Sequence, residues 1–68
     1  MKFNFKRLKA ERIAKGLTLA EMGESMDISE SGYKRIEDGE RKLGVDQFAT
    51  LAEKLGFNQS TIHIFFIQ

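Results

Sequence analysis

The chain has 68 residues, of which 41% are apolar and none is cysteine, and its formal net charge is +1. This length allows one small domain over residues 1–68. Because the chain has no cysteine and His63 is its only histidine, we expect no disulfide and no metal site of ordinary zinc-ligand type. No cofactor is expected either. The longest apolar run, residues 64–67, is far shorter than the roughly 20 residues that span a bilayer, and no cleavable signal follows Met1, so we expect a soluble, cytoplasmic protein without a membrane partner.

Four short helices are predicted, each bordered by residues that begin or end a helix. In chain order they cover about 5–15, 19–25, 30–38 and 45–55. A residue suited to an N-cap precedes each of them: Asn4, Thr18, Ser29 and Gly44. A glycine suited to a left-handed stop follows three of them: Gly16, Gly39 and Gly56. These patterns, in a chain without proline, predict an all-α fold, a compact bundle of four to five short helices.

The last part of the chain carries a weaker pattern. Asn58 is a candidate cap for a final segment through Ile62, and residues 63–68 fit either helix or strand, with helix favoured by the all-α context. These residues hold more apolar surface than the end of one small chain easily buries. We therefore favour a homodimer seam in residues 59–68 over simple closure of the core. By their spacing, Ile62 and Phe66 would close the core, and the seam would be formed by Ile64, Phe65 and Ile67.

Apolar residues at helical spacing predict a single core. Its expected members are Phe5, Leu8, Leu17, Met22, Met26, Ile28, Tyr33, Ile36, Val45, Phe48, Leu51, Leu55 and Phe57. Arg12 projects into the middle of this apolar arc, where an unpaired guanidinium would be very costly. Glu37 is the best candidate for its partner; the alternative is that Arg12 extends its charged end into solvent.

Residues 18–39 have an organisation of their own: a capped helix of about two turns, a short turn and a second capped helix. A short helix lying across a second one can hold the second above the surface, where it can enter a DNA major groove about 12 Å wide. Gly23 would lie where the two helices approach most closely, and a side chain larger than that of alanine would push them apart.

A series of residues in order along the chain resembles a known family. They are Leu8, Arg12, residues 16–18, Met22, Gly23, Met26, Ile28, Ser29, residues 36–39 and residues 51–57. At this spacing, residues 5–62 resemble the lambda repressor and Cro-type helix-turn-helix domain, often called the XRE family. The resemblance implies a lambda repressor-like fold, with a helix-turn-helix at about 18–39, and a pairing of Arg12 with Glu37. It also implies a repressor-like transcriptional regulator of bacterial or phage type that binds operator DNA, sequence-specifically, as a homodimer.

The resemblance also implies which residues contact double-stranded DNA. The base-reading positions are Glu30, Ser31, Lys34 and Arg35. The phosphate contacts are the backbone at Thr18 and Leu19 and the side chains of Arg41 and Lys42. The alternative for Lys34 and Arg35 is an ordinary solvated helix face.

Several residues depart from the family pattern, among them Gly32 inside the helix 30–38 and Leu43 with Gly44 before the helix 45–55; three others bear on the turn and on DNA binding. Leu19 replaces a glutamine that reaches phosphate, and is expected to expose an apolar side chain. Glu30 puts a negative charge where glutamine or arginine is common, which should weaken binding to a polyanion. Asp27 stands at a turn position usually filled by glycine, where a left-handed backbone is expected.

A second interpretation is a protein-interaction module on the same fold, of antitoxin or antirepressor type. The acidic stretch 18–33 favours this alternative, and the basic residues at 34, 35, 41 and 42 disfavour it. An enzyme is not expected, because no histidine, cysteine or serine stands in a nucleophile-and-base arrangement. No small-molecule ligand is evident from the sequence.

Overall fold

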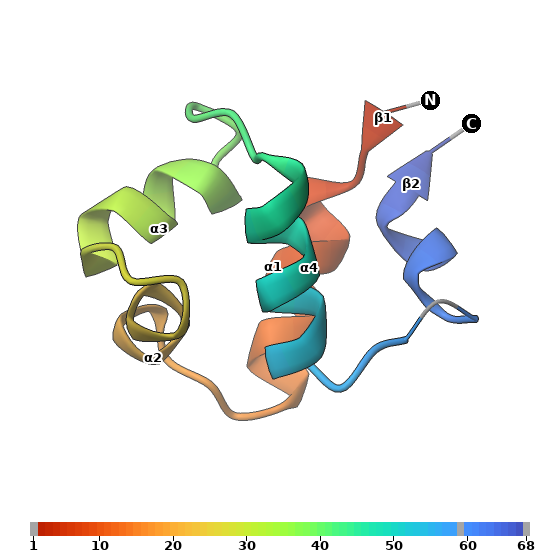
Figure 1. Cartoon of the computed structure of the whole chain (residues 1–68), viewed down its shortest axis with the longest axis horizontal. Helices are drawn as coiled ribbons and strands as arrows, with labels where there is room; N and C mark the ends of the chain where they lie inside the picture. The colour runs from red at the N-terminus through yellow and green to blue at the C-terminus, as the bar shows by residue number, and fades with distance from the viewer. Residues whose placement is uncertain (1, 59, 68) are drawn as a thin grey trace.

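The structure, a computed structural model, describes residues 2–58 and 60–67 and has an all-α helix-turn-helix fold. Its elements in chain order are β1 (Lys2–Phe3), α1 (Phe5–Ala14), α2 (Leu19–Ser25), α3 (Glu30–Glu37), α4 (Val45–Lys54), the 3-10 helix η1 (Ile62–Phe65) and β2 (Phe66–Ile67). In Figure 1, α2 and α3 lie on one side of α4, and β1 and β2 lie on the other. Within the described residues, no helix has both the length and the apolar character needed to cross a membrane.

The four α-helices begin at the predicted caps. In three of them the cap accepts a hydrogen bond from the N–H three residues on: Asn4 from Arg7, Thr18 from Glu21 and Ser29 from Gly32. At the start of α4, Gly44 has no side chain to offer, and Gln47 instead accepts from the Gly44 N–H at 3.1 Å. The predicted glycine stops after α1, α3 and α4 all have positive φ angles. Local sequence signals therefore define the helices to within a residue at either end.

The core lies between the helices and η1. Its fully buried large side chains are Leu8, Met22, Tyr33, Ile36, Leu51, Leu55 and Phe65. Val45 was predicted to belong to this core, but it is 86% exposed, so that prediction is wrong. The reason is its place in the first turn of α4, at the rim of the molecule, where its side chain is not covered by a neighbouring element.

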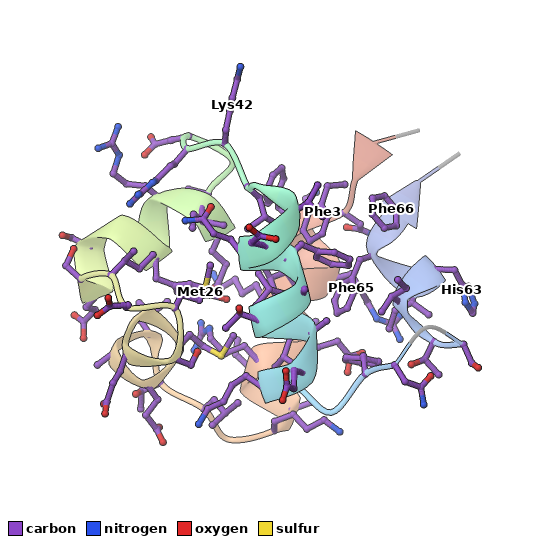
Figure 2. The ribbon with its side chains drawn as sticks, in the orientation of Figure 1. Phe3, Met26, Lys42, His63, Phe65 and Phe66 are labelled. Atoms are coloured by element: carbon purple, nitrogen blue, oxygen red, sulfur yellow. The ribbon has the colours of Figure 1, made fainter. Side chains whose placement is uncertain are left out.

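The six phenylalanines form one connected group, which we call the Phe cluster. The ring of Phe3 lies 4.9 Å from that of Phe5, 5.4 Å from Phe48 and 5.8 Å from Phe65, measured between centroids. Phe57 and Phe66 join the group through pairs with Phe65 and Phe3 at 5.0 and 5.7 Å. Figure 2 shows Phe3, Phe65 and Phe66 close to one another beside α4. Such ring pairs add about 0.5–1.5 kcal/mol each beyond the area they bury.

The C-terminal part differs from the expected helix. After a turn that begins at Asn58, the chain forms the 3-10 helix η1 and then the strand β2, which pairs antiparallel with β1. Phe66 is opposite Phe3 in this pair. Prediction of helix for residues 66–67 was therefore wrong, because the partner strand comes from the opposite end of the sequence and no local pattern reveals it. Gln59 and Gln68 lie outside the described residues.

Phe65 is also placed differently from the expectation. Its side chain is 0% exposed and packs within the Phe cluster, so it offers no surface to a second chain and cannot belong to a seam. In a 3-10 helix, residues three apart share a side, and Phe65 therefore turns inward with half-buried Ile62. Ile64 is half-buried and packs against the core, as does Phe66. The side chain of Ile67, the third predicted seam residue, lies outside the described part of the structure.

Candidate functional site

The turn between α2 and α3 brings the two helices into close contact at Gly23. A Cβ atom built on Gly23 would lie 2.9 Å from both the Ile28 and the Ser29 carbonyl oxygens. This contact is closer than predicted, because even alanine would not fit without a shift of backbone. The Ile28 N–H donates to the Gly23 carbonyl at 2.9 Å and closes the turn. Asp27 has a φ of 58°, the left-handed conformation predicted for it.

The helix α3 has two distinct faces. Tyr33 and Ile36 are fully buried and Glu37 is 7% exposed, which fixes this side of the helix against the core. The opposite side carries four exposed residues, here called the α3 face: Glu30, Ser31, Lys34 and Arg35. These are the four residues predicted to read bases, and the fold brings them together on one accessible surface.

An ion pair between Arg12 and Glu37 joins α1 to the buried side of α3. Arg12 Nε and Nη2 donate to Glu37 Oε2 and Oε1 at 2.8 and 3.0 Å, and Arg12 Nη1 donates to the Leu17 carbonyl at 2.9 Å. The side chains are only 11% and 4% exposed, and the hydrogen bond with Glu37 raises the pKa of Arg12. The pair predicted from the sequence is therefore present, and it sets the orientation of α3 relative to α1.

Tyr33 lies beside this pair and is fully buried. Its hydroxyl makes no hydrogen bond of acceptable geometry with any described residue, although the Glu37 carboxylate is close enough to act on it electrostatically. Burial, and then the negative charge of Glu37, raise the pKa of the Tyr33 hydroxyl far above that of a free tyrosine. The phenol is thus held neutral inside the core.

Alkaline titration of Tyr33 tests this arrangement. In the unfolded chain the phenol ionises near its reference pKa of about 10, whereas in the folded chain it ionises only at higher pH. The contribution of the neutral Tyr33 phenol to the free energy of unfolding is therefore fully present below about pH 10, and it is lost as the pH rises above that value. Because Tyr33 is the only tyrosine, tyrosinate absorbance should appear together with loss of helical circular dichroism. Ionisation near pH 10 in a protein that remains folded would contradict this expectation.

The α3 face carries less free positive charge than its sequence suggests. Lys34 Nζ lies 2.8 Å from Asp38 Oδ2, one helical turn away, and this hydrogen bond raises the pKa of Lys34. The sequence interpretation missed this pair, although the spacing of four residues is visible in the sequence. Ser31 is also engaged, through a 3.3 Å hydrogen bond between its hydroxyl and that of Ser29. Arg35, by contrast, is exposed and makes no ion pair with a described residue.

The loop between α3 and α4 adds two exposed cations beside the α3 face, Arg41 and Lys42. Lys42 projects from this loop away from the rest of the molecule (Figure 2). Arg41 lies back against α3, since a Cβ atom built on Gly32 would be 2.9 Å from Arg41 Nη1. Sequence patterns do not show this contact, because it depends on the path of the loop.

The start of α2 is partly occupied by the chain itself. The Glu21 carboxylate accepts from the Thr18 N–H at 2.9 Å, and the Thr18 hydroxyl accepts from the Glu21 N–H at 3.0 Å. The backbone hydrogen bond from Thr18 lowers the pKa of Glu21, so a negative charge is fixed at this end of α2. Leu19 is half-buried and packs against the core, so the expectation that it exposes its side chain is wrong. The N–H groups of Leu19 and Ala20 remain for an external anion.

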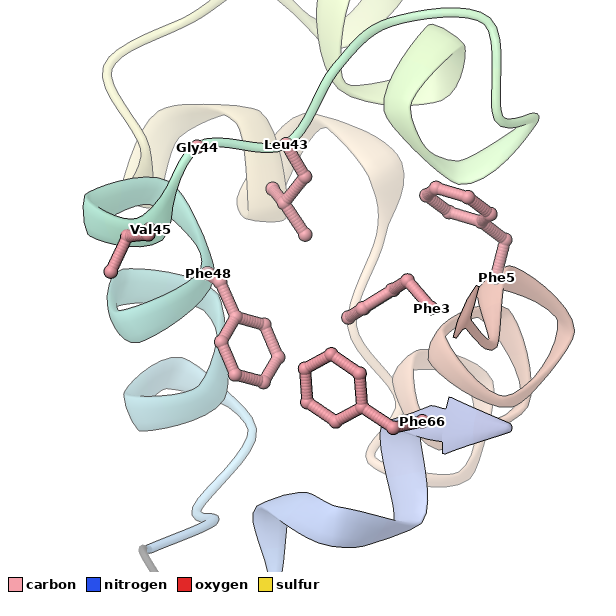
Figure 3. A pocket seen from close by; sticks show the side chains of 7 residues that line it. All are labelled: Phe3, Phe5, Leu43, Gly44, Val45, Phe48 and Phe66. Atoms are coloured by element: carbon pink, nitrogen blue, oxygen red, sulfur yellow. The ribbon is translucent and has the colours of Figure 1, made fainter. Parts of the chain in front are cut away.

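An apolar pocket of about 460 Å³ lies between the paired strands and the start of α4. Figure 3 shows its lining: Phe3, Phe5, Leu43, Gly44, Val45, Phe48 and Phe66. None of these side chains is charged or polar, so the pocket offers no group for acid–base or nucleophilic chemistry. Among the described residues, no three histidine, cysteine or carboxylate side chains are grouped so that they could hold a metal ion. The pocket is therefore not the candidate site, which lies at α3 and the loop that follows it.

Comparison with known proteins agrees with this geometry. A family model described as a helix-turn-helix domain matches residues 6–63. A protein of Bacillus subtilis (strain 168), the uncharacterized HTH-type transcriptional regulator YqaF, is 40% identical over 53 residues, which cover 78% of this chain and 70% of that protein. No solved structure matches the chain significantly.

Proposed function

This chain belongs to the helix-turn-helix domain family, and from that membership we propose that it is a DNA-binding transcriptional regulator whose helix α3 enters the major groove. The observation that supports this most directly is the α3 face, four exposed polar or charged side chains on a helix whose opposite side is fixed in the core. A rigidly held helix with such a face fits a major groove, which is about 12 Å wide. A regulator of this kind acts by binding rather than by catalysis.

Each member of the α3 face has a chemistry suited to base edges. The guanidinium of Arg35 can donate two hydrogen bonds to O6 and N7 of a guanine, and Lys34 can donate to the same atoms once it leaves Asp38. Ser31 can donate or accept, and Glu30 can accept from N4 of a cytosine. Arg35 is the strongest candidate because it is free of intramolecular ion pairs within the described chain.

Phosphate contacts are assigned to two places beside α3. Arg41 and Lys42 extend the positive charge of Arg35 along the loop, and each can bind a phosphate oxygen. The backbone N–H groups at the start of α2, in particular that of Leu19, are a weaker candidate because the charged Glu21 carboxylate lies there. Thr18 already uses both its N–H and its hydroxyl in the capping box.

We further propose that this chain is a lambda repressor and Cro-type (XRE) regulator and that it works as a repressor in the cytoplasm of a bacterial or phage-bearing host. The pairing of Arg12 with Glu37 supports the subfamily, since the resemblance implies that pair. Such a regulator binds two half-sites about 34 Å apart as a homodimer. With Phe65 excluded, Ile64 and Ile67 remain as the proposed seam residues.

Substitution of Arg35 tests the role of α3. On a duplex selected by the protein from a random library, Arg35→Ala is expected to weaken binding by about 1–3 kcal/mol and to relax specificity at one base pair. Fluorescence anisotropy titrations on the selected and random duplexes measure both effects. The matched control Lys42→Ala, which removes a phosphate contact, should weaken both complexes equally. Equal losses for Arg35→Ala would contradict base reading by that residue.

Substitution of Asp38 tests whether its ion pair restrains the α3 face. Asp38→Asn keeps the size of the side chain, frees Lys34 and removes a negative charge near the DNA. We expect the affinity for any duplex to rise about two- to fivefold, the range expected for one exposed charge. The control Glu11→Gln frees Arg7 on α1 in the same way and should have a smaller effect. Unchanged or lower affinity of Asp38→Asn would place Lys34 away from the DNA.

The alternative of a protein-interaction module, of antitoxin or antirepressor type, is favoured by one observation. Acidic residues accompany the cations of the site, with Glu30 on the α3 face, Asp38 at its end and Glu21 at the start of α2. Titration of the chain with random duplex DNA at two salt concentrations separates the two proposals. Salt-dependent binding supports the regulator, and no binding at low salt supports the interaction module.

A further inference from the structure

Gly32 is a buried glycine inside α3 whose backbone does not require glycine. Its φ angle is not among the positive ones, in contrast to the glycines that end α1, α3 and α4. Apart from proline, glycine is the poorest helix-forming residue, so this position weakens α3. Because the backbone does not need glycine here, the feature to explain is the space that a side chain would fill.

That space is occupied by Arg41. A Cβ atom on Gly32 would lie 2.9 Å from Arg41 Nη1 and 3.2 Å from Ser29 Oγ, both closer than a Cβ normally approaches. The guanidinium from the loop after α3 therefore rests directly against the first turn of that helix. Within the described residues, no carboxylate pairs with Arg41, so its donors are available to an external anion.

We propose that Gly32 is a positioning residue, which seats the Arg41 guanidinium against the first turn of α3 so that it binds a DNA phosphate at the wall of the major groove. This proposal rests on the proposed function. At about 100° per residue, Gly32 lies on the flank of α3 next to Arg35 rather than in the middle of the α3 face. The middle of a helix face in the groove meets base edges, whereas its flanks meet the phosphate-lined walls.

The fixed position of the guanidinium also explains how Arg41 alone can contribute strongly to the affinity for DNA. A long side chain that is free in solution loses rotamer freedom when it binds, and one already held in place loses less. A guanidinium offers two parallel donors to a phosphate, which fixes the distance of α3 from the backbone of the DNA. In this arrangement Arg41 sets how deep α3 sits, while Arg35 reads a base.

The salt dependence of DNA binding tests the proposal, with the full chain and a random-sequence duplex as the probe. Each phosphate contact contributes about 0.9 to the slope of log K against log salt, or about eightfold in affinity per tenfold change in salt. Arg41→Ala is expected to lower the slope by about one contact. Gly32→Ala should lower it by the same amount although the arginine is retained, and the double variant should lower it no further.

Gly44→Ala is the matched control, because a Cβ atom there meets only Gln47 Oε1 at an ordinary 3.8 Å. Its slope should equal that of the wild type. A wild-type slope for Gly32→Ala would overturn the proposal, as would a wild-type slope for Arg41→Ala. Failure of the wild type to bind any duplex would instead overturn the proposed function.

A second measurement needs no DNA and detects the seating itself. If the Cβ atom collides with the guanidinium, Gly32→Ala should raise the melting temperature more in the Arg41→Ala background than in the wild type. Without the guanidinium, α3 gains the higher helix propensity of alanine and has no collision to offset it. Equal shifts in the two backgrounds would show that Arg41 does not rest on Gly32, and would overturn the proposal even if DNA binding is normal.

Discussion

Arg12→Met is expected to lower the free energy of unfolding by about 3–5 kcal/mol, enough to unfold much of a domain this small. The substitution leaves the Glu37 carboxylate, whose side chain is 4% exposed, without its two hydrogen bonds from the guanidinium. It also removes the donor to the Leu17 carbonyl. A buried charge without a partner is far more costly than a buried pair, and this decides the sign and the size of the effect.

Urea titration followed by circular dichroism measures this loss. The double variant with both Arg12 and Glu37 replaced by apolar residues should be more stable than Arg12→Met alone, because it leaves no buried charge unpaired. Arg7→Met is the matched control on the same helix, since the pair with Glu11 is exposed and should contribute about 0.5 kcal/mol or less. An Arg12→Met variant as stable as the wild type would mean that the guanidinium is solvated.

Gly23→Ala should destabilise the protein by about 1–3 kcal/mol, although the same change in an open helix usually stabilises. The new methyl group would meet the carbonyl oxygens of Ile28 and Ser29 at 2.9 Å. These are backbone atoms at the start of α3, so they can move only if the whole helix moves away from α2. DNA binding should therefore fall together with stability.

The control for Gly23→Ala is Gly32→Ala, also a buried helical glycine. Its near neighbours are the ends of the Arg41 and Ser29 side chains, which can move more easily than backbone. Urea midpoints for the two variants should differ clearly, with Gly23→Ala the less stable. If both variants unfold at the wild-type midpoint, α2 and α3 do not pack as closely as described.

Sequence reasoning worked best where the cause of a structure lies within one turn of chain. The caps at Asn4, Thr18 and Ser29 were predicted because each needs only an acceptor side chain and an N–H three residues on. The left-handed conformation of Asp27 was predicted from the family resemblance, because glycine usually fills that turn position. The ion pair of Arg12 could be predicted because a guanidinium in an apolar arc must have a partner.

Most of the errors have a different cause, which is contact between distant parts of the chain. Phe65 was assigned to a seam because neither the 3-10 geometry of η1 nor its ring partner Phe3 could be inferred from residues 59–68. Leu19 turned inward and Val45 outward because helix rotation is fixed by neighbours rather than by the helix itself. The four predicted base-reading residues are exposed on one side of α3, and their role stays a prediction. The pairing of Lys34 with Asp38 was overlooked although it is a local contact.

The Phe cluster and the β1–β2 pair have a consequence for the lifetime of the folded state. They join Phe3 to Phe65 and Phe66, nearly the whole chain apart, whereas α2 and α3 meet through residues close in sequence. Contacts that close long loops form late in folding, so the helix-turn-helix is expected to assemble before the two ends meet. Weakening a late contact chiefly speeds unfolding. The phenylalanines near the two ends of the chain are therefore expected to govern how long α3, once formed, stays folded.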